Sequence, residues 1–233
     1  MAKIPLLLLP GLNATFRLWQ PQIKALSDMA DIWVPDTTRH DAIANLAASI
    51  LAEAPPRFAL GGLSMGGYVA FEIMRRAPER VMRLALVDTQ ARPGDAASTQ
   101  QRLRLIDLAL RGGVDKVLAA SPWTALVAPP RADDRALGAI IEGMARDIGV
   151  QAYARQQRLI MNRPDSRPTL AAITVASLVI VGEQDPVTPP DLSREMASGI
   201  AGARIEIIPD CGHLSSLECP EAVSRALRQW LLG

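Results

Sequence analysis

Short apolar runs alternate with segments of helical periodicity along most of the chain. Six such runs predict β-strands at Ile4–Leu9, Ile32–Val34, Phe58–Leu60, Leu84–Val87, Leu178–Val181 and Ile205–Ile208. Apart from Glu206 in the last run, the runs are continuously apolar, which is typical of parallel strands that are covered by helices on both faces. The pattern therefore predicts an α/β protein with a mostly parallel sheet of about six strands flanked by helices.

In two of the segments between and after these runs, apolar residues recur at the spacing of one helix face, a pattern called a helical stripe below. Apolar residues recur at spacings of three and four at Ile43, Leu46, Ala47, Ile50 and Leu51, and again at Val223, Leu227, Trp230 and Leu231. This spacing places them on one face of a helix, facing the sheet. Pro220 stands where the second helix would begin, a position that tolerates proline.

The alternation stops between Thr89 and about Val175, where no strand-like run occurs. Helical stripes are found instead, at Leu103, Ile106 and Leu110 and at Leu137, Ile140, Ile141, Met144 and Ile148. A structureless loop of this length is implausible inside a compact domain. We expect residues 1–91 and 174–233 to form the core, and residues 92–173 to form a helical cap inserted after the strand that ends near Asp88. The alternative is that these helices cover the outer faces of the sheet.

Composition narrows the possible partners. The 233 residues include 25 basic and 24 acidic side chains, and this net charge of +1 gives no electrostatic reason to expect nucleic acid or an acidic membrane as partner. The 2 cysteines and 2 histidines cannot supply zinc sites built only from Cys and His at two separate positions, and no Cys-x-x-Cys motif occurs. We expect neither a metal nor a cofactor. No export signal and no apolar run of about 20 residues is evident. We expect a cytoplasmic location, with Cys211 and Cys219 reduced.

The most informative motif is Gly62-Leu63-Ser64-Met65-Gly66, which lies between a predicted strand and a predicted helix. A strand-to-helix turn this tight forces strained backbone angles on the serine and leaves no space for neighbouring Cβ atoms, so glycines flank it. The turn presents the Ser64 hydroxyl at the carboxyl edge of the sheet. Ser64 is therefore the candidate nucleophile, and a tight turn with an idle serine is the alternative.

A serine hydroxyl needs an adjacent base, usually a histidine that is oriented by a carboxylate. His213 follows the last predicted strand and reaches the same edge as Ser64, whereas His40 lies in a polar run before a helix. We therefore expect His213 to be the base. Asp185, which follows the strand Leu178–Val181, is the preferred acid because the order Ser, Asp, His is typical of such hydrolases. Asp88 and Glu183 remain alternative acids.

An oxyanion hole requires two backbone N–H groups near the nucleophile. One should come from Met65, the residue after the serine. The other should come from Leu12, in the loop that follows the first strand, because Gly11 lets this loop approach Ser64. Both side chains could equally be ordinary core residues.

Taken together, these segments resemble the α/β-hydrolase superfamily over essentially the whole chain. The matching motifs are Pro10-Gly11-Leu12, Gly62 to Gly67, Val181 to Asp185 and Cys211-Gly212-His213. The resemblance implies Ser64 as nucleophile, Asp185 as acid, His213 as base, and Leu12 and Met65 as oxyanion donors. Within the superfamily, the chain most resembles small single-cap enzymes, namely carrier-protein methyl ester esterases, enol-lactone hydrolases and related carbon–carbon hydrolases. Two features depart from the family: Pro10 stands where His is usual, and six strands are expected instead of eight.

The resulting hypothesis is a cofactor-free serine hydrolase that cleaves a small carboxylic ester or lactone through an acyl-enzyme. Carbon–carbon bond hydrolysis or a lyase step by the same residues is one alternative, and a non-catalytic binding protein on the same fold is another. We expect Trp123, Met144 and Tyr153 to contact the substrate, together with Ile140 and Met161, although such residues can also be helix packing. Arg146, Arg155 and Arg158 are candidates to reach the pocket, where an arginine would suggest a substrate carboxylate.

Overall fold

The computed structural model describes residues 3–233, so the first two residues of the expected core lie outside it. Its sheet contains six strands, all parallel, in the order β2-β1-β3-β4-β5-β6. The strands are β1 Ile4–Leu9, β2 Ala30–Trp33, β3 Phe58–Leu63, β4 Val81–Val87, β5 Ala176–Gly182 and β6 Arg204–Ile208. The predicted α/β class and six-stranded sheet are therefore confirmed. The observed strands β3 to β6 extend beyond the expected ranges, and β2 begins earlier than expected and ends before Val34.

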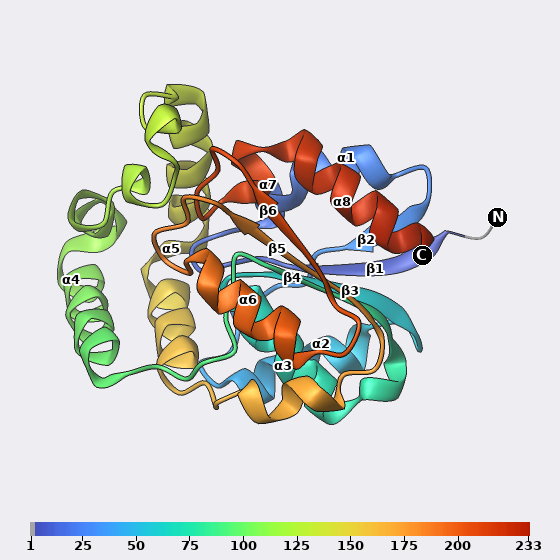
Figure 1. Ribbon diagram of the computed structural model, residues 1–233. Coiled ribbons are helices and arrows are strands. Elements are labelled where there is room, and N and C mark those ends of the chain that lie inside the picture. The colour runs from blue at the N-terminus through green and yellow to red at the C-terminus, as the bar shows by residue number, and fades with distance from the viewer. Residues whose placement is uncertain (1–2) are drawn as a thin grey trace.

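Helices cover both faces of the sheet (Figure 1). Helices α2 Ile43–Glu53, α3 Met65–Arg76 and α6 Pro190–Gly199 lie on one face, and α1 Gln20–Leu26 and α8 Pro220–Leu232 lie on the other. The short helix α7 Ser215–Glu218 precedes α8. The expected stripes account for α2 and α8, in which Leu46, Ile50, Leu227 and Trp230 are buried.

The continuously apolar strands supply two cores, because successive side chains of a strand point to opposite faces. In β1, Leu6 and Leu8 pack with Trp19 and Trp230 on the α1–α8 side, whereas Leu7 and Leu9 belong to the α2–α3 side. Both faces of the strand are therefore buried, as the unbroken run Leu6–Leu9 predicts.

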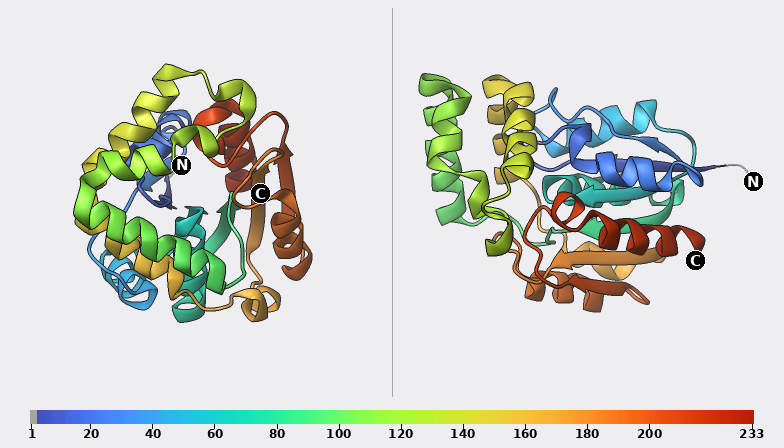
Figure 2. Two further views of the ribbon diagram at one scale, coloured as in Figure 1. Left: turned by 90° about the vertical axis from the view of Figure 1, so that its left-hand side faces the viewer. Right: turned by 90° about the horizontal axis from the view of Figure 1, so that it is seen from above.

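Two long helices, α4 Ala96–Ala120 and α5 Arg135–Met161, occupy the segment without strands. They lie side by side at the carboxyl ends of the strands, at the opposite end from both chain termini (Figure 2). This position differs from the alternative, in which these helices would cover the outer faces of the sheet. Each helix is broken by a glycine with positive φ, Gly113 at 79° and Gly149 at 70°, a conformation that strongly favours glycine.

The spacing of apolar residues in this segment correctly predicted that helices form, but it did not correctly predict which of their residues are buried. Leu103 and Leu110 of the first stripe are 53% and 47% exposed, and only Ile106 is buried. In the second stripe Leu137, Ile141 and Met144 are buried, whereas Ile140 is exposed. Within residues 3–233, no helix is both long enough and apolar enough to cross a membrane.

Candidate active site

Ser64 occupies the turn between β3 and α3, with φ 54° and ψ −114°. A Cβ on Gly62 would lie 2.4 Å from the Gly66 carbonyl oxygen, and one on Gly66 would lie 2.2 Å from the Leu9 carbonyl oxygen. Both positions therefore require glycine for the steric reason that the motif suggests. The Ser64 N–H donates to the Val87 carbonyl at 3.0 Å, which ties the turn to β4. A strained conformation of this kind persists only where the surrounding structure enforces it.

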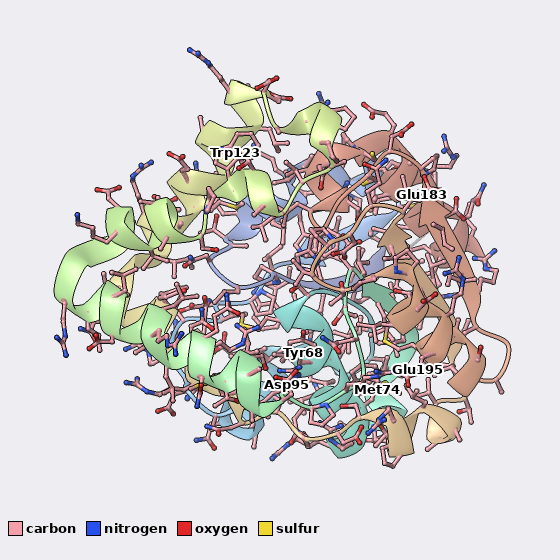
Figure 3. The ribbon with its side chains drawn as sticks, turned by 60° about the vertical axis from the view of Figure 1, so that its left-hand side comes forward. Tyr68, Met74, Asp95, Trp123, Glu183 and Glu195 are labelled. Carbon is pink, nitrogen blue, oxygen red and sulfur yellow. The ribbon has the colours of Figure 1, made fainter. Side chains whose placement is uncertain are left out.

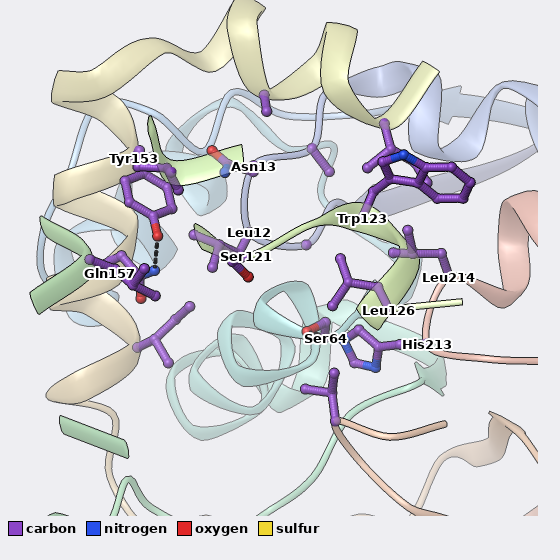
Figure 4. Close-up of a pocket in the computed structure, with 18 of the residues that line it drawn as sticks. Leu12, Asn13, Ser64, Ser121, Trp123, Leu126, Tyr153, Gln157, His213 and Leu214 are labelled. Atoms are coloured by element: carbon purple, nitrogen blue, oxygen red, sulfur yellow. Dashed lines mark hydrogen bonds between the residues drawn. The ribbon is translucent and has the colours of Figure 1, made fainter. Parts of the chain in front are cut away.

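His213 lies in the loop after β6 and is almost completely buried. Its Nε2 atom lies 2.9 Å from Ser64 Oγ, and its Nδ1 atom lies 2.8 Å from Asp185 Oδ2. The backbone N–H of His213 donates to the Leu126 carbonyl at 2.7 Å. The His213 loop is therefore also bonded to the segment between α4 and α5. Figure 4 shows the imidazole beside Ser64 at the wall of a pocket. The structure thus joins the serine, the histidine and the aspartate in one hydrogen-bonded series.

Asp185 is held by four hydrogen bonds after the end of β5. Its Oδ1 atom accepts from the backbone N–H groups of Val187 and Thr188, each at 2.8 Å. Its Oδ2 atom accepts from the Thr188 hydroxyl at 2.7 Å as well as pairing with His213. The carboxylate is therefore fixed in position and aimed at the imidazole.

The same contacts shift the ionisation of the pair. Burial alone would raise the pKa of Asp185, but the facing imidazole and the hydrogen bonds from Thr188 lower it below its usual range. Burial alone would lower the pKa of His213, but the Asp185 carboxylate outweighs this effect and raises it. At neutral pH this environment favours an ionised Asp185 that stabilises positive charge on the imidazole.

The two alternative acids lie in different environments. Asp88 is completely buried but accepts hydrogen bonds from the backbone N–H groups of Gly182 and Ser215, each at 3.0 Å. Burial and the nearby Asp185 charge raise the pKa of Asp88 to about 8. Glu183 is exposed and lies apart from the pocket residues Tyr68 and Trp123 (Figure 3).

The alternative base, His40, lies between β2 and α2 and does not line the pocket that contains Ser64. His213 is thus the histidine that contacts the serine. Asp88 instead links the two loops that carry Asp185 and His213.

The loop after β1 lies against Ser64. A Cβ on Gly11 would approach Ser64 Cβ to 3.5 Å, so this loop and the serine are in direct contact. In the described part of the chain, the N–H groups of Leu12 and Met65 donate to no protein acceptor. Met65 is also the first residue of α3, whose N-terminal end carries partial positive charge. Two unused donors therefore belong to residues that adjoin the serine, one in sequence and one across the loop contact.

Ser64 and His213 line a cavity of about 430 Å³. This volume falls within the range of roughly 300–1,000 Å³ that is usual for small-molecule sites. Its floor comes from the core loops, and its outer wall comes from α4, α5 and the short helix Trp123–Ala125. Trp123, Met144 and Tyr153 all line it, whereas Ile140 and Met161 do not.

The polar residues of the pocket differ from those expected. Arg146 pairs with Asp115 and Glu142, Arg155 donates to the Thr38 carbonyl, and neither these nor Arg158 lines the cavity. Arg102, Gln157 and Tyr68 line it instead. Arg102 lies on α4, the helix predicted from the apolar residues Leu103 and Ile106. The spacing of those apolar residues did not indicate that Arg102 faces the pocket, because the face that α4 turns inward depends on its packing against α5.

Within residues 3–233, no group of three or more His, Cys, Asp or Glu side chains is arranged to hold a metal ion. Cys211 and Cys219 are both free thiols.

A model of the alpha/beta hydrolase family matches residues 6–226, and the chain belongs to this family. It is 26% identical to 3-oxoadipate enol-lactonase 2 from Acinetobacter baylyi, over 93% of this chain and 84% of the relative. It is 32% identical to the putative non-heme bromoperoxidase BpoC of Mycobacterium tuberculosis, over 82% of this chain and 74% of that relative. The malate-bound structure of a thermophilic esterase from Thermogutta terrifontis superposes with a TM-score of 0.91 at 30% identity, covering 99% of this chain and 90% of the esterase. The family, the enol-lactonase and the esterase support hydrolase activity.

Proposed function

We propose that this protein is a cofactor-free serine hydrolase that cleaves a small carboxylic ester or lactone. The observation that carries the proposal is the hydrogen-bonded series from Ser64 Oγ through both nitrogens of His213 to Asp185, which opens on a pocket of small-molecule size. The relatives named enol-lactonase and esterase support the same bond type.

In the proposed reaction, His213 Nε2 removes the Ser64 proton as the hydroxyl oxygen attacks the substrate carbonyl. The negative charge that develops on the carbonyl oxygen is stabilised by the Leu12 and Met65 N–H groups, each worth about 3 kcal/mol of barrier. Asp185 keeps the imidazole oriented and stabilises its positive charge. His213 then gives the proton to the departing alcohol, which leaves an ester on Ser64.

Hydrolysis of this acyl-enzyme repeats the same steps with water. His213 takes a proton from the water, and the resulting tetrahedral intermediate expels Ser64, which recovers its proton. In a lactone the leaving alcohol stays attached to the acyl group, so one product with a new hydroxyl is released. Residues 92–173 act as the cap in this proposal, because α4 and α5 supply most of the outer wall of the pocket.

Replacement of the nucleophile tests this function. We expect Ser64→Ala to abolish turnover of nitrophenyl esters of short acids while its circular dichroism and melting temperature remain close to those of the wild type. Ser121→Ala removes another hydroxyl from the pocket wall and should keep most of the activity.

A fluorophosphonate should label the wild type at Ser64 and leave Ser64→Ala unlabelled. A burst of nitrophenol before steady state would report the acyl-enzyme, which the alternative of a pure base mechanism does not predict. Full activity of Ser64→Ala would disprove the proposal.

A further inference from the structure

Arg102 carries a positive charge into the pocket without an acidic partner. It lies on α4, is half-buried, and lines the same cavity as Ser64 and His213. None of the ion pairs found among residues 3–233 includes Arg102. Asp95, on the same side of α4, is exposed and accepts from the Ser98 N–H as the cap of this helix. A guanidinium always carries its charge in proteins, so the pocket holds an uncompensated cation.

The only hydrogen bond that Arg102 makes in the described chain is to a neutral residue. Its Nη1 donates to Gln157 Oε1 at 2.6 Å, and Gln157 Nε2 donates in turn to the Tyr153 hydroxyl at 2.6 Å. Gln157 and Tyr153 are almost completely buried, so this series is rigid. A guanidinium has five N–H donors. Arg102 is thus held in place by one of them, and its other donors remain for a ligand.

Arg163 adds positive charge near Arg102, but it does not reach the cavity and so would not contact a bound molecule. Arg163 stacks over the Tyr68 ring, with 4.4 Å between the guanidinium carbon and the ring centre. Its donors go to the carbonyl oxygens of Arg92 and Ile160, and it does not line the cavity. Tyr68 lines the cavity. Arg102 is therefore the cation that a bound molecule can contact.

The cationic end and the reactive end of the pocket are separate. Figure 4 shows Tyr153 and Gln157 across the pocket from Ser64 and His213. The cavity wall also contains apolar side chains, among them Leu12, Leu105 and Ile160. A molecule that spans the cavity would therefore place its scissile carbonyl at Ser64 and an anionic group at Arg102, with an apolar chain linking them.

We infer that Arg102 determines specificity by binding a carboxylate on the substrate, so that the preferred substrates are anionic esters or lactones whose carboxylate is separated from the scissile carbonyl by a short apolar chain. Guanidinium and carboxylate match in geometry and can form two parallel hydrogen bonds. This inference rests on the proposed ester hydrolysis at Ser64. The competing explanation is that Arg102 only links α4 to α5 through Gln157.

The kinetic test compares matched charged and neutral esters. Monomethyl esters of linear dicarboxylic acids carry the carboxylate on the acyl side, and 4-acetoxybutyrate carries it on the alcohol side. Methyl alkanoates and butyl acetate are their neutral counterparts. We expect the wild type to prefer one charged series, and this outcome identifies the side on which the carboxylate lies.

We expect Arg102→Met to lower kcat/KM for the preferred charged ester roughly 30-fold or more, mainly through KM, because a buried charge pair loses one partner. The loss on the neutral ester should be at least about ten times smaller. Arg102→Lys keeps the charge but not the two-donor geometry and should recover part of the preference. Arg104→Met, which removes an exposed arginine of the same helix, is the matched control and should keep the wild-type preference.

Equal losses on charged and neutral esters in Arg102→Met would overturn the inference in favour of the structural link. The absence of any preference for charged esters in the wild type would overturn it as well. Circular dichroism and melting temperature of Arg102→Met would establish that the variant is folded.

A binding measurement separates this inference from the proposed function. Glutarate and suberate are titrated by calorimetry into Ser64→Ala and into the double variant Ser64→Ala/Arg102→Met. We expect one of them to bind the first protein and to lose about 30-fold or more in affinity for the second. If Arg102-dependent binding is found but no ester is cleaved, the proposed function fails and the anion site stands. If esters are cleaved but neither dicarboxylate binding nor ester preference depends on Arg102, the inference alone fails.

Discussion

At the scale of single residues, the site depends on the contrast between a strained serine and a rigid acid. The positive φ of Ser64 is maintained because Gly62 and Gly66 allow the backbone around it to pack at distances that any side chain would prevent. Asp185 is held by four hydrogen bonds, so the imidazole of His213 has a fixed partner. The serine and the acid are thereby both positioned before a substrate arrives, which lowers the cost of reorganisation.

The raised pKa of His213 predicts the pH dependence of turnover. In the proposed mechanism the imidazole must be neutral to accept the Ser64 proton, so kcat/KM should rise with pH through an ionisation that lies above the ordinary histidine value of about 6.5. Asp185→Asn removes the charge that favours the protonated imidazole. We expect this variant to move the acidic limb of the pH profile to lower pH and to reduce kcat by a factor on the order of 10⁴.

The matched control for this prediction is Glu183→Gln, which neutralises an exposed carboxylate two residues away and should leave the acidic limb in place. Stopped-flow or steady-state rates between pH 5 and 9 (a range chosen about the usual histidine pKa) provide the measurement. A shift caused by Glu183→Gln but not by Asp185→Asn would show that the wrong acid has been chosen.

At the scale of elements, the loop that carries His213 is joined to the segment before α5 by one buried carboxylate. Glu218 Oε2 accepts from the backbone N–H groups of Ala128 and Gly212 at 2.8 and 3.0 Å. Its Oε1 atom accepts from the Leu214 N–H at 3.0 Å. Together with the bond from His213 N–H to the Leu126 carbonyl, these contacts couple the histidine loop to the wall of the pocket.

We expect Glu218→Gln to destabilise the protein by about 1–3 kcal/mol, because the amide NH₂ cannot accept and at least one buried N–H loses its partner. The resulting mobility of the His213 loop should also lower kcat. Urea denaturation and ester turnover measure the two effects. Glu221→Gln, at the exposed start of α8, should cost less than about 1 kcal/mol. Equal effects of the two substitutions would contradict the proposed coupling.

At the scale of the whole molecule, α5 is attached to the core at several separate places, and α4 packs on α5. Gln156 of α5 accepts from the Asn13 N–H at 3.0 Å and donates to the Thr37 hydroxyl at 3.2 Å. Leu137, Ile141 and Met144 pack into the same apolar cluster as Trp19 and Trp230. The pocket is therefore formed between parts of the chain that share buried contacts.

Because these contacts are shared, we expect the helical segment and the sheet to unfold in a single transition. Far-ultraviolet circular dichroism, tryptophan fluorescence and ester activity should all be lost at the same urea concentration. Loss of activity at a clearly lower concentration than the loss of circular dichroism would mean that α4 and α5 detach first, and would contradict this expectation.

The sequence alone determined the sheet and the turn at Ser64, because both depend on local chemistry. Continuous apolar runs indicate strands buried on both faces, and the spacing Gly62, Ser64 and Gly66 indicates a turn that excludes side chains. The presence of only 2 histidines also restricted the choice of base before any geometry was known.

Tertiary structure alone decided which side chains meet. Asp88, Glu183 and Asp185 all follow strands that end at one edge of the sheet, and only Asp185 pairs with His213 through a hydrogen bond. Arg102 of α4 lines the pocket where α4 packs on α5, whereas Arg146 of α5 pairs with acids and does not line the cavity. Periodicity specifies that a helix forms, but the direction of each side chain follows from contacts between residues that are far apart in the chain.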